Sequence, residues 1–390
     1  MQRDRFIEET PFFTEEHARL ATSVANFAAD EIEPHAHEAE EVASDENFRS
    51  LVSLIAQTGL LSHSVVQPGG LPLDARSLCV VREALSYHSP LADLAFVMQG
   101  LGTYAVGLAA PEHVRDFWLE RARTGRAVAA FALTEPDAGS DVANVQTTAE
   151  REGDSYVIRG RKCFISNAGG ADFSTVFART GTRTDGRAEL SAFVVGARMP
   201  GFSVAARTQL VAPHPIGEIE FDGVRVPAED RVGAEGDGFR LAMQTMDMFR
   251  ASVGAAACGM ARRALDEAVH HAKTRRQFGV SLAMHQLVQE KLAVMQTELD
   301  AARLLVYRAA NLRDTRPDGS NLTRAASEAK LYATEAAQRV IDEAVQIHGG
   351  YGLVRGSTVE RLYRDVRALR IYEGTSEIQK LIIARELLKE

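Results

Sequence analysis

The carboxylate of Glu373 occupies a position where a general base would be useful. It lies between an aromatic residue and a glycine, directly before a segment whose helical start Thr375 or Ser376 can cap. Glu377 can interact favourably with the positive N-terminus of that helix, whereas Glu373 is required neither for capping nor for this interaction. Because apolar neighbours disfavour the charged form, a carboxyl group in this position is a candidate for a raised pKa and for proton abstraction. A surface salt bridge is the alternative interpretation.

Two further segments contain small and polar residues that can approach a ligand closely. Residues 131–141 (FALTEPDAGSD) combine turn formers and hydroxyl groups at the entrance to a β-rich region, which also fits a tight loop with local hydrogen bonds. Residues 350–356 (GYGLVRG) are close to a dinucleotide fingerprint, but three residues precede the last glycine and the run follows a helical segment. We therefore exclude a Rossmann site there, although these glycines can still bring backbone N–H groups to a phosphate.

Other common catalytic patterns are missing from the sequence. It has no HExxH frame and no GxSxG elbow, and His270 and His271 are predicted to be solvated on a helix surface. We therefore predict no metal site and no serine hydrolase chemistry. Cys79, Cys163 and Cys258 lie far apart, which predicts reduced thiols that pack in the interior.

The spacing of apolar residues predicts helices, then a β region, then helices. Helical spacing extends over residues 11–125, with one segment capped by Thr14 and another closed by Gly59. Between residues 127 and 233 we predict strands at 156–160, 163–166 and 190–195. Alternation on both sides of Asp222 and Gly223 predicts a hairpin there. Long Ala-rich helices are predicted over residues 239–276, 282–312, 323–348 and 376–388. The expected domains are therefore 1–126 (helical), 127–234 (β) and 235–390 (helical bundle).

Composition limits the partners. The 390-residue chain carries a net charge of −9, which gives no general attraction to nucleic acid or to anionic membranes. No run approaches the roughly 18 apolar residues needed to span a bilayer. Residues 1–14 lack the apolar stretch of a secretory signal, so we expect a cytoplasmic protein without a membrane span.

Six segments, taken together and in order, resemble those of the acyl-CoA dehydrogenases. They are residues 131–141, 160–167 (GRKCFISN), 224–227 (VRVP), 275–279 (RRQFG), 346–352 (QIHGGYG) and 371–379 (IYEGTSEIQ). The resemblance covers nearly the whole chain. It implies an α+β multidomain protein with an N-terminal helical domain, a middle β-barrel or sandwich and a C-terminal four-helix bundle. It also implies a homotetramer or homodimer that binds FAD between the β domain and the bundle.

The resemblance carries over residue by residue to an FAD site. Thr134 would hydrogen-bond the isoalloxazine ring, and Ser140 would meet phosphate or substrate. The remaining residues implied on the two sides of the ring and along the pyrophosphate are Phe131, Leu133, Gly139, Phe164, Ile165 and Ser166. The FAD of a neighbouring subunit would be held by Arg275, Gln277, Phe278, Gln286, Gln346, Gly349 and Gly350. Thr375 and Glu377 would complete the adenylate end.

The chemistry implied by the resemblance gives Glu373 its role. The glutamate would take the α-proton of an acyl-CoA while the β-hydrogen leaves as hydride to flavin N5. The ribityl hydroxyl of FAD and the backbone N–H of Glu373 would stabilise the thioester carbonyl, and Gly374 would contact the substrate. Asp247 and Arg250 match positions that contact the CoA portion. Some family members carry the base at the position of Phe249, so Glu373 is the only family-type base in this sequence. The implied electron acceptor is an electron-transfer flavoprotein.

The sequence departs from the family pattern at four places. Phe164 replaces a common Trp, Ser166 a common Thr, and Gln99 stands about where many members have His. Residues 210–217 (LVAPHPIG) are unlike the usual stretch, and this segment and Gln99 lie in regions that can shape the substrate or carrier site.

Three alternatives to acyl-CoA dehydrogenation stay open from the sequence. The same chemistry can act on an acyl group tethered to a carrier protein. Arg179, Arg183 and Arg187 could bind such an acidic carrier, or they could simply be solvated residues of a surface loop. Relatives that pass electrons to oxygen are a second alternative, although monooxygenases usually lack the glutamate. The third is a helical scaffold that has lost catalysis.

Overall fold

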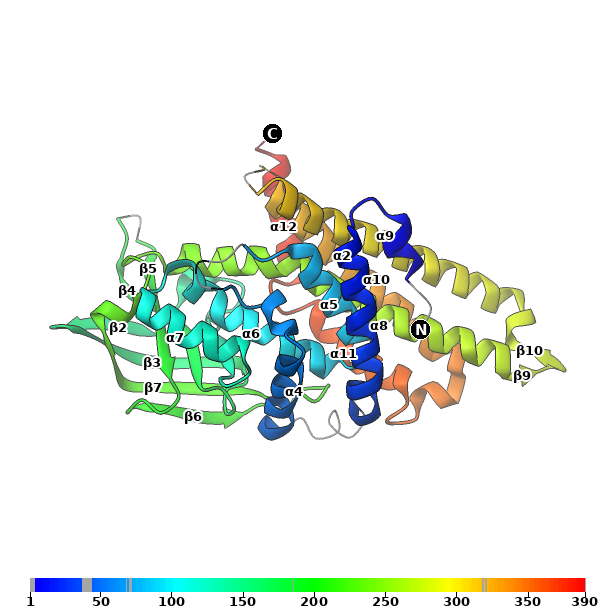
Figure 1. Ribbon diagram of the computed structural model, residues 1–390, viewed down its shortest axis with the longest axis horizontal. Helices are drawn as coiled ribbons and strands as arrows, with labels where there is room; N and C mark the ends of the chain where they lie inside the picture. Colours follow the sequence, from blue (N-terminus) through cyan, green and yellow to red (C-terminus); the bar gives the residue numbers. More distant parts are fainter. Residues whose placement is uncertain are drawn as a thin grey trace. The chain divides into compact units, whose positions relative to one another are not determined.

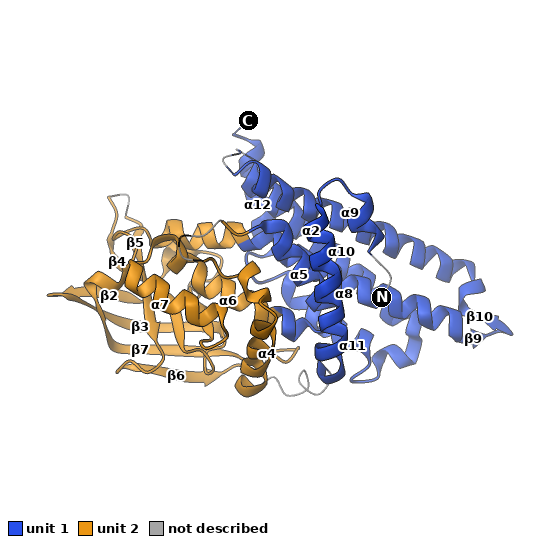
Figure 2. Ribbon diagram, in the orientation of Figure 1, with its two compact units in different colours: residues 1–38, 74–93, 249–390 blue, residues 39–73, 94–248 orange. Residues whose placement is uncertain are grey.

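The computed structural model describes residues 4–36, 44–67, 69, 72–184, 186–317, 319 and 321–389. The chain forms two compact units, coloured separately in Figure 2. Residues 1–38, 74–93 and 249–390 form unit 1, and residues 39–73 and 94–248 form unit 2. The predicted succession of a helical, a β and a helical region is confirmed (Figure 1).

Unit 2 is built on one eight-stranded mixed sheet. Its strand order is β6-β7-β3-β2-β4-β5-β8, and β1 pairs in parallel with β4. The strands are β1 (Ala129–Ala132), β2 (Thr148–Glu152), β3 (Ser155–Ser166), β4 (Phe173–Thr182), β5 (Ala188–Gly196), β6 (Phe202–Arg207), β7 (Ile216–Pro227) and β8 (Arg231–Val232). The helices of this unit are α4 (Asp45–Gln57), most of α6 (Pro90–Ala109), α7 (Glu112–Arg123) and the first part of α8 (Gly238–Thr274).

Alternating side chains give the sheet two apolar faces. On one face Tyr156 and Ile158 of β3 pack with Phe221 and Val224 of β7. On the other face the phenyl ring of Phe173 and its neighbours pack against buried residues of α6, α7 and α8. Covering both faces keeps the sheet edges that carry the site loops in fixed positions.

The hairpin predicted at Asp222 and Gly223 is wrong. β7 continues through these residues, and both sides of the dipeptide pair with the single strand β3. Asp222 lies opposite Arg159 and Val224 opposite Ile158, so Gly223 is the extra residue of a β-bulge with φ of 74°. A glycine in the left-handed region suits a bulge as well as a turn, and alternation around an Asp-Gly pair does not distinguish the two.

Gln99 has a structural role in unit 2. Its side-chain amide nitrogen donates to the carbonyl oxygens of Ala122 (3.1 Å) and Ala127 (2.7 Å), and its oxygen accepts from the N–H of Ala129 (2.8 Å). The side chain is fully buried. Because these three bonds fix the approach to β1, Gln99 positions the backbone that leads into the 131–141 loop.

Helix α6 is apolar and long enough to cross a membrane by composition, contrary to our reading of the sequence. However, 78% of that apolar window is buried inside the protein, which is the environment of a core helix.

Unit 1 is helical. It contains α1 (Arg5–Glu9), α2 (Glu15–Phe27), the π-helical turn η1 (Ala28–Ile32), α5 (Ala75–His88), the rest of α8, α9 (Gln286–Thr315), α10 (Leu322–His348), α11 (Thr358–Leu369) and α12 (Ser376–Leu387). Helix α10 packs against α9, α11 and α12, and α5 packs against α2 and α9. An added Cβ on Gly254 of α8 would come within 2.6 Å of Val306 Cγ2, so this glycine permits close packing of α8 on α9. Helix α11 was not predicted.

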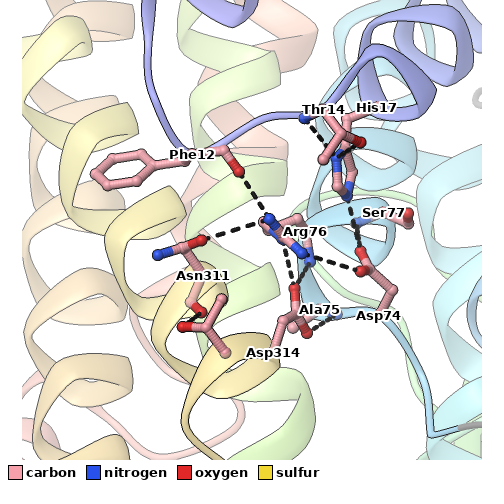
Figure 3. Close-up of polar contacts among 10 residues, drawn as sticks. Phe12, Thr14, His17, Asp74, Ala75, Arg76, Ser77, Asn311 and Asp314 are labelled. Carbon is pink, nitrogen blue, oxygen red and sulfur yellow. Dashed lines mark hydrogen bonds and ion pairs between the residues drawn. The ribbon is translucent and has the colours of Figure 1, made fainter.

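Polar contacts tie the N-terminus of α5 to the end of α9 (Figure 3). The Asp314 carboxylate accepts hydrogen bonds from the backbone N–H of Ala75 (2.7 Å) and Arg76 (3.1 Å) and from Arg76 Nε (2.8 Å). Asp74 caps the same helix through Ser77 N–H (2.6 Å) and contacts His17 of α2 at 3.1 Å. Two carboxylates at one helix N-terminus satisfy its free N–H groups and its dipole.

Candidate active site

Glu373 is held in an uncommon backbone conformation in unit 1. Its φ is 52°, and Gly374 follows with φ of 89°. Among the described residues, four non-glycine residues have positive φ: Glu373, Phe164, Phe278 and Asn167. The first three were predicted as site residues. Left-handed backbone at a non-glycine residue costs about 1–3 kcal/mol and collects at functional sites, so this distribution supports the site prediction.

Three polar side chains keep the 370–376 loop in this shape. Lys330 Nζ donates to the carbonyl oxygen of Gly374 at 2.8 Å, and Gln379 Nε2 donates to the same oxygen at 3.0 Å. Glu335 accepts from Ser376 Oγ at 2.6 Å and forms an ion pair with Arg370 at 2.8 Å. Together these contacts offset the backbone strain at Glu373.

One oxygen of the Glu373 carboxyl group is buried without a hydrogen-bond partner among the described residues, although the residue as a whole is partly exposed. This oxygen, Oε2, is inaccessible to solvent. Burial raises the pKa of Glu373 above its ordinary value, although the charges of Arg82, Lys330 and Arg250 oppose the rise. Burial likewise lowers the pKa of Lys330 to about 8. A carboxyl group with a free oxygen and a raised pKa can accept a proton from a ligand.

The strongest of these opposing charges belongs to a buried ion pair. Arg82 of α5 donates from Nε and Nη2 to the two carboxylate oxygens of Asp93, each at 2.8 Å, and from Nη1 to Ser252 Oγ at 2.9 Å. The side chains of Arg82 and Asp93 are 0% and 1% exposed. A bidentate pair of this kind fixes two opposite charges in the interior, and they act on Glu373 in opposite senses: Arg82 lowers its pKa and Asp93 raises it.

The two residues predicted to contact CoA lie one turn apart on α8. Asp247 is half-buried, and Arg250 is 5% exposed with a charge that lowers the pKa of Glu373. Phe249, at the alternative position for a family base, is fully buried.

In unit 2 a buried ion pair shapes the 131–141 loop. Lys162 of β3 donates from Nζ to Glu135 Oε1 at 2.8 Å and to the carbonyl oxygen of Leu133 at 3.0 Å. Glu135 also accepts from the backbone N–H of Gln146 (2.6 Å) and Thr147 (2.9 Å). Burial lowers the pKa of Lys162 to about 8.

This pairing determines which predicted residues of the loop are accessible. Thr134 is half-buried, and its carbonyl oxygen accepts from Cys163 N–H at 3.0 Å. Gly139 and Ser140 are exposed, with open space where a Cβ on Gly139 would lie. Leu133 and Phe131 instead direct their side chains into the apolar core, so only their backbone can face a ligand.

The end of β3 presents one ring and one hydroxyl group. Phe164 has φ of 54° and is 59% exposed, whereas Ile165 is buried in the sheet core. Ser166 is half-buried, and its Oγ lies 2.7 Å from Nε2 of His214. Residues 210–217, which depart from the family pattern, therefore contact a predicted site residue through His214.

Unit 1 contains a cavity of about 500 Å³ beside the C-terminus of α10. Arg275, Gln277, Gly349 and Gly350 line it, as predicted residues, together with His271, Leu282, Ile347, His348, Tyr351 and Val354. His271, predicted on a helix surface, is half-buried on α8, and its ring stacks on that of His348 with centroids 4.3 Å apart.

Other residues predicted to hold FAD in unit 1 do not line this cavity. Phe278 is 95% exposed at the tip of the β9 (Arg276–Gln277) and β10 (Val280–Ser281) hairpin, with φ of 51°. Gln286 and Gln346 are exposed on α9 and α10. Thr375 caps α12 by accepting from Ile378 N–H at 3.3 Å, and Glu377 lies exposed in the first turn.

Comparisons with known proteins identify the family. Models of the acyl-CoA dehydrogenase N-terminal, middle and C-terminal domains match residues 14–126, 130–224 and 236–388. A 3-(aryl)acrylate reductase of Clostridium sporogenes is 39% identical over 97% of this chain and 100% of its own. The chain belongs to the acyl-CoA dehydrogenase family. It is an oxidoreductase, and its cofactor is FAD.

Two more members of the acyl-CoA dehydrogenase family add detail. The caffeyl-CoA reductase–Etf complex subunit CarC of Acetobacterium woodii is 36% identical over 97% of this chain and 100% of its own. The structure of an acyl-CoA dehydrogenase complexed with FAD from Bacillus anthracis aligns with a TM-score of 0.90 and 30% identity. That alignment covers 97% of this chain and 68% of the other.

The residues present fit FAD. Glycines with open space above them at 139, 349 and 350 leave room for close approach of a pyrophosphate, and Arg275 supplies a guanidinium group at the cavity in unit 1. The exposed ring of Phe164 offers a flat apolar surface of the kind that an isoalloxazine ring can cover.

Sequence reasoning missed several residues that position the site. Lys162 and Glu135 lie within the quoted motifs but were given no role. Lys330 carries a readable signal, because a lysine at the centre of the Ala-rich buried face of α10 requires a buried partner. Arg82 and Asp93 carry no comparable signal.

Proposed function

We propose that this protein catalyses FAD-dependent α,β-dehydrogenation of an acyl-CoA, giving the trans-2-enoyl-CoA, with Glu373 as the base. The observation that carries the proposal is the buried Glu373 carboxyl group, with its raised pKa and its free Oε2. Bound FAD supplies the acceptor for the β-hydrogen. The protein supplies position, electrostatics and exclusion of water.

The roles of the chain's own residues follow from their contacts. Glu373 receives the α-proton on its carboxylate, and burial brings its pKa closer to working pH. The charges of Arg82, Lys330 and Arg250 oppose this rise and favour the ionised carboxylate. Lys330 and Gln379 hold the Gly374 carbonyl and thereby fix the backbone of Glu373. Thr134 and Ser140 are the half-buried and exposed hydroxyls proposed to meet the flavin and the phosphate or substrate.

We propose CoA as the carrier and an electron-transfer flavoprotein as the electron acceptor. The name of one relative supports both choices, since it is a subunit of a caffeyl-CoA reductase–Etf complex. An acyl group on a carrier protein is the alternative substrate, because the phosphopantetheine arm is common to both carriers.

The test is anaerobic mixing of the purified FAD-loaded protein with a panel of acyl-CoA thioesters while the oxidised flavin band is recorded. Glu373→Gln is expected to keep FAD and to bind thioester, but to reduce the flavin at least about a hundredfold more slowly, as for a lost general base. Glu290→Gln, which changes an exposed carboxylate on α9, is the matched control and keeps the parent rate. Undiminished reduction by Glu373→Gln contradicts the assignment of the base. Bleaching by acyl carrier protein thioesters but by no acyl-CoA selects the alternative substrate.

A second candidate is the same chemistry in the opposite direction, reduction of an arylacrylyl thioester. The names of two relatives favour it, because one is a 3-(aryl)acrylate reductase and the other a caffeyl-CoA reductase. Glu373 would then donate the proton that it accepts during dehydrogenation.

The two directions separate in one measurement. Protein whose flavin has been reduced with dithionite is mixed anaerobically with cinnamoyl-CoA or with crotonyl-CoA, and the return of the oxidised band is timed. Faster reoxidation by cinnamoyl-CoA, combined with weak bleaching by the saturated panel, supports the reductase. The reverse pattern supports the dehydrogenase.

A further inference from the structure

The hydrogen bond between Ser166 and His214 joins a predicted flavin-facing residue to the segment that departs from the family pattern. Ser166 is the last residue of β3, and its Oγ lies 2.7 Å from His214 Nε2. The backbone around the histidine is fixed, because Pro213 and Pro215 flank it. The carbonyl oxygen of Pro215 also accepts from Asn167 N–H at 2.7 Å. The position of the imidazole relative to Ser166 is therefore built into the fold of unit 2.

The surroundings of His214 make its ring neutral. Its Nδ1 is buried, and none of the residues that the structure describes provides a hydrogen-bond partner for it. Burial lowers the pKa of His214 to about 4, so the imidazole carries a single N–H near neutral pH.

Two arrangements of that one hydrogen are possible. If it is on Nδ1, a buried N–H donor has no acceptor, and Ser166 must give its hydroxyl hydrogen to Nε2. If it is on Nε2, the histidine donates to Ser166 Oγ and only a lone pair on Nδ1 is left unused. Buried N–H groups without an acceptor are rarer than acceptors with unused lone pairs, so the second arrangement is favoured. The hydroxyl hydrogen of Ser166 then points away from His214 and is free to donate to a ligand.

We propose that His214 is a positioning residue that fixes the Ser166 hydroxyl group as a hydrogen-bond donor to the isoalloxazine ring of FAD. The inference rests on the proposed FAD site, since it takes Ser166 to face the ring. The oxidised ring presents more acceptor nitrogens than the reduced ring, which carries additional N–H groups. A hydroxyl group whose hydrogen is directed at the ring by the His214 contact therefore favours the oxidised form, while its second lone pair stays available. Without His214 the hydroxyl hydrogen is free to turn away from the ring, and reduction of the flavin becomes easier.

The tautomer of His214 can be measured in the parent holoprotein itself. The holoprotein is labelled with 15N-histidine and studied by solid-state NMR, and a sample of His214→Gln identifies the His214 signals by difference. Protonation on Nε2 alone is expected. Protonation on Nδ1, or on both nitrogens near neutral pH, overturns the proposal.

The effect on the flavin is measured as a two-electron midpoint potential. We expect His214→Leu to shift the oxidation equilibrium about tenfold toward reduced flavin, which corresponds to about 30 mV. Ser166→Ala is expected to shift it in the same direction, and the double variant no further than Ser166→Ala alone. His214→Gln retains an N–H donor and is expected to stay close to the parent. His113→Leu, which removes an exposed histidine of the same unit, is the control.

The outcomes separate this inference from the proposed function. FAD content and bleaching by substrate are recorded for each variant. If the parent binds FAD and is bleached, but His214→Leu leaves the potential unchanged while Ser166→Ala shifts it, His214 does not orient the hydroxyl group. Unchanged potentials in both variants also overturn the inference and leave the dehydrogenase assignment standing. A parent protein that binds no FAD contradicts the proposed function itself.

Discussion

Glu373, the proposed base, can take a proton only when it is ionised, so the fall in the rate of flavin reduction at low pH (the low-pH limb) is expected to report its pKa. Burial raises that pKa, Arg82 is the charge that opposes the rise most, and Asp93 acts in the opposite sense to Arg82. We predict that Arg82→Gln moves the limb to higher pH and Asp93→Asn moves it to lower pH, each by about half a unit or more. The rate of anaerobic flavin reduction across pH, measured by stopped flow, tests both.

Ser252→Ala is the matched control for these variants. Ser252 contacts Arg82 at 2.9 Å but carries no charge, so its loss leaves the limb in place. Limbs that move in the same direction in Arg82→Gln and Asp93→Asn contradict the electrostatic account, because a general loss of packing affects both variants alike.

At the residue level the proposed base could be named from the sequence, whereas its electrostatic environment could not. Glu373 stands in a short segment whose neighbours indicate an apolar junction and a helix cap. Arg82 meets its partners 11 and 170 positions away, and both contacts depend on how α5, α6 and α8 pack. A pairwise contact of this kind leaves no periodic pattern in the sequence.

At the level of single elements, the bulge at Gly223 in β7 explains why the predicted hairpin was wrong. The backbone conformation of this glycine can be tested by substitution. Gly223 has φ of 74°, and an added Cβ would meet its neighbours at 3.7 Å or more, which is ordinary contact. Alanine there is strained only through its backbone, so we predict that Gly223→Ala lowers the free energy of unfolding by about 1–2 kcal/mol. The urea midpoint of β-sheet unfolding, followed by circular dichroism, measures the loss.

Gly196→Ala provides the comparison, because Gly196 ends β5 without positive φ and an added Cβ would lie 3.9 Å from its nearest neighbour. Its midpoint is expected to stay at or above that of the parent. Equal midpoints in the two variants contradict the left-handed conformation at Gly223.

The long helices were predicted within a few residues, since an amphipathic period over several turns is a strong signal. The start of α9 was less accurate: residues 282–284 form a 3₁₀ turn, and the helix begins at Gln286. Helix α11 was missed although its apolar face (Val359, Leu362, Val366 and Leu369) has helical spacing.

At the scale of the whole molecule, FAD binding is expected to stabilise the folded protein. Arg275, one of the residues proposed to hold FAD, lines the cavity of about 500 Å³ in unit 1. Because a guanidinium–phosphate contact is worth about 1.5–3 kcal/mol, we predict that Arg275→Ala weakens FAD binding by about tenfold to a hundredfold. Titration of apoprotein with FAD, followed by quenching of flavin fluorescence, gives the dissociation constants.

Lys273→Ala, an exposed change near the end of α8, is the control and keeps the parent affinity. The melting temperature of Arg275→Ala is expected to approach that of the parent only at higher FAD concentration, since a ligand that binds the folded state stabilises it according to the ratio of its concentration to its dissociation constant. Parent-like FAD affinity in Arg275→Ala contradicts this role.

The succession of a helical, a β and a second helical region was predictable, because apolar residues have helical spacing in the first and third regions and strand-like alternation in the second. Which chain segments join each compact unit was not. Residues 74–93 carry helical spacing like the rest of the N-terminal region, yet they join the helices of unit 1, while residues 39–73 join the sheet unit. Membership in a core depends on long-range packing that local spacing does not encode.

The left-handed backbone at Glu373 also has a consequence for directed evolution. Glycine adopts φ near 52° without penalty and brings no buried charge, so Glu373→Gly relieves two costs with a single change. A library screened only for survival of heating therefore enriches inactive clones at this position. A useful thermostabilisation screen for this enzyme must score turnover in every round.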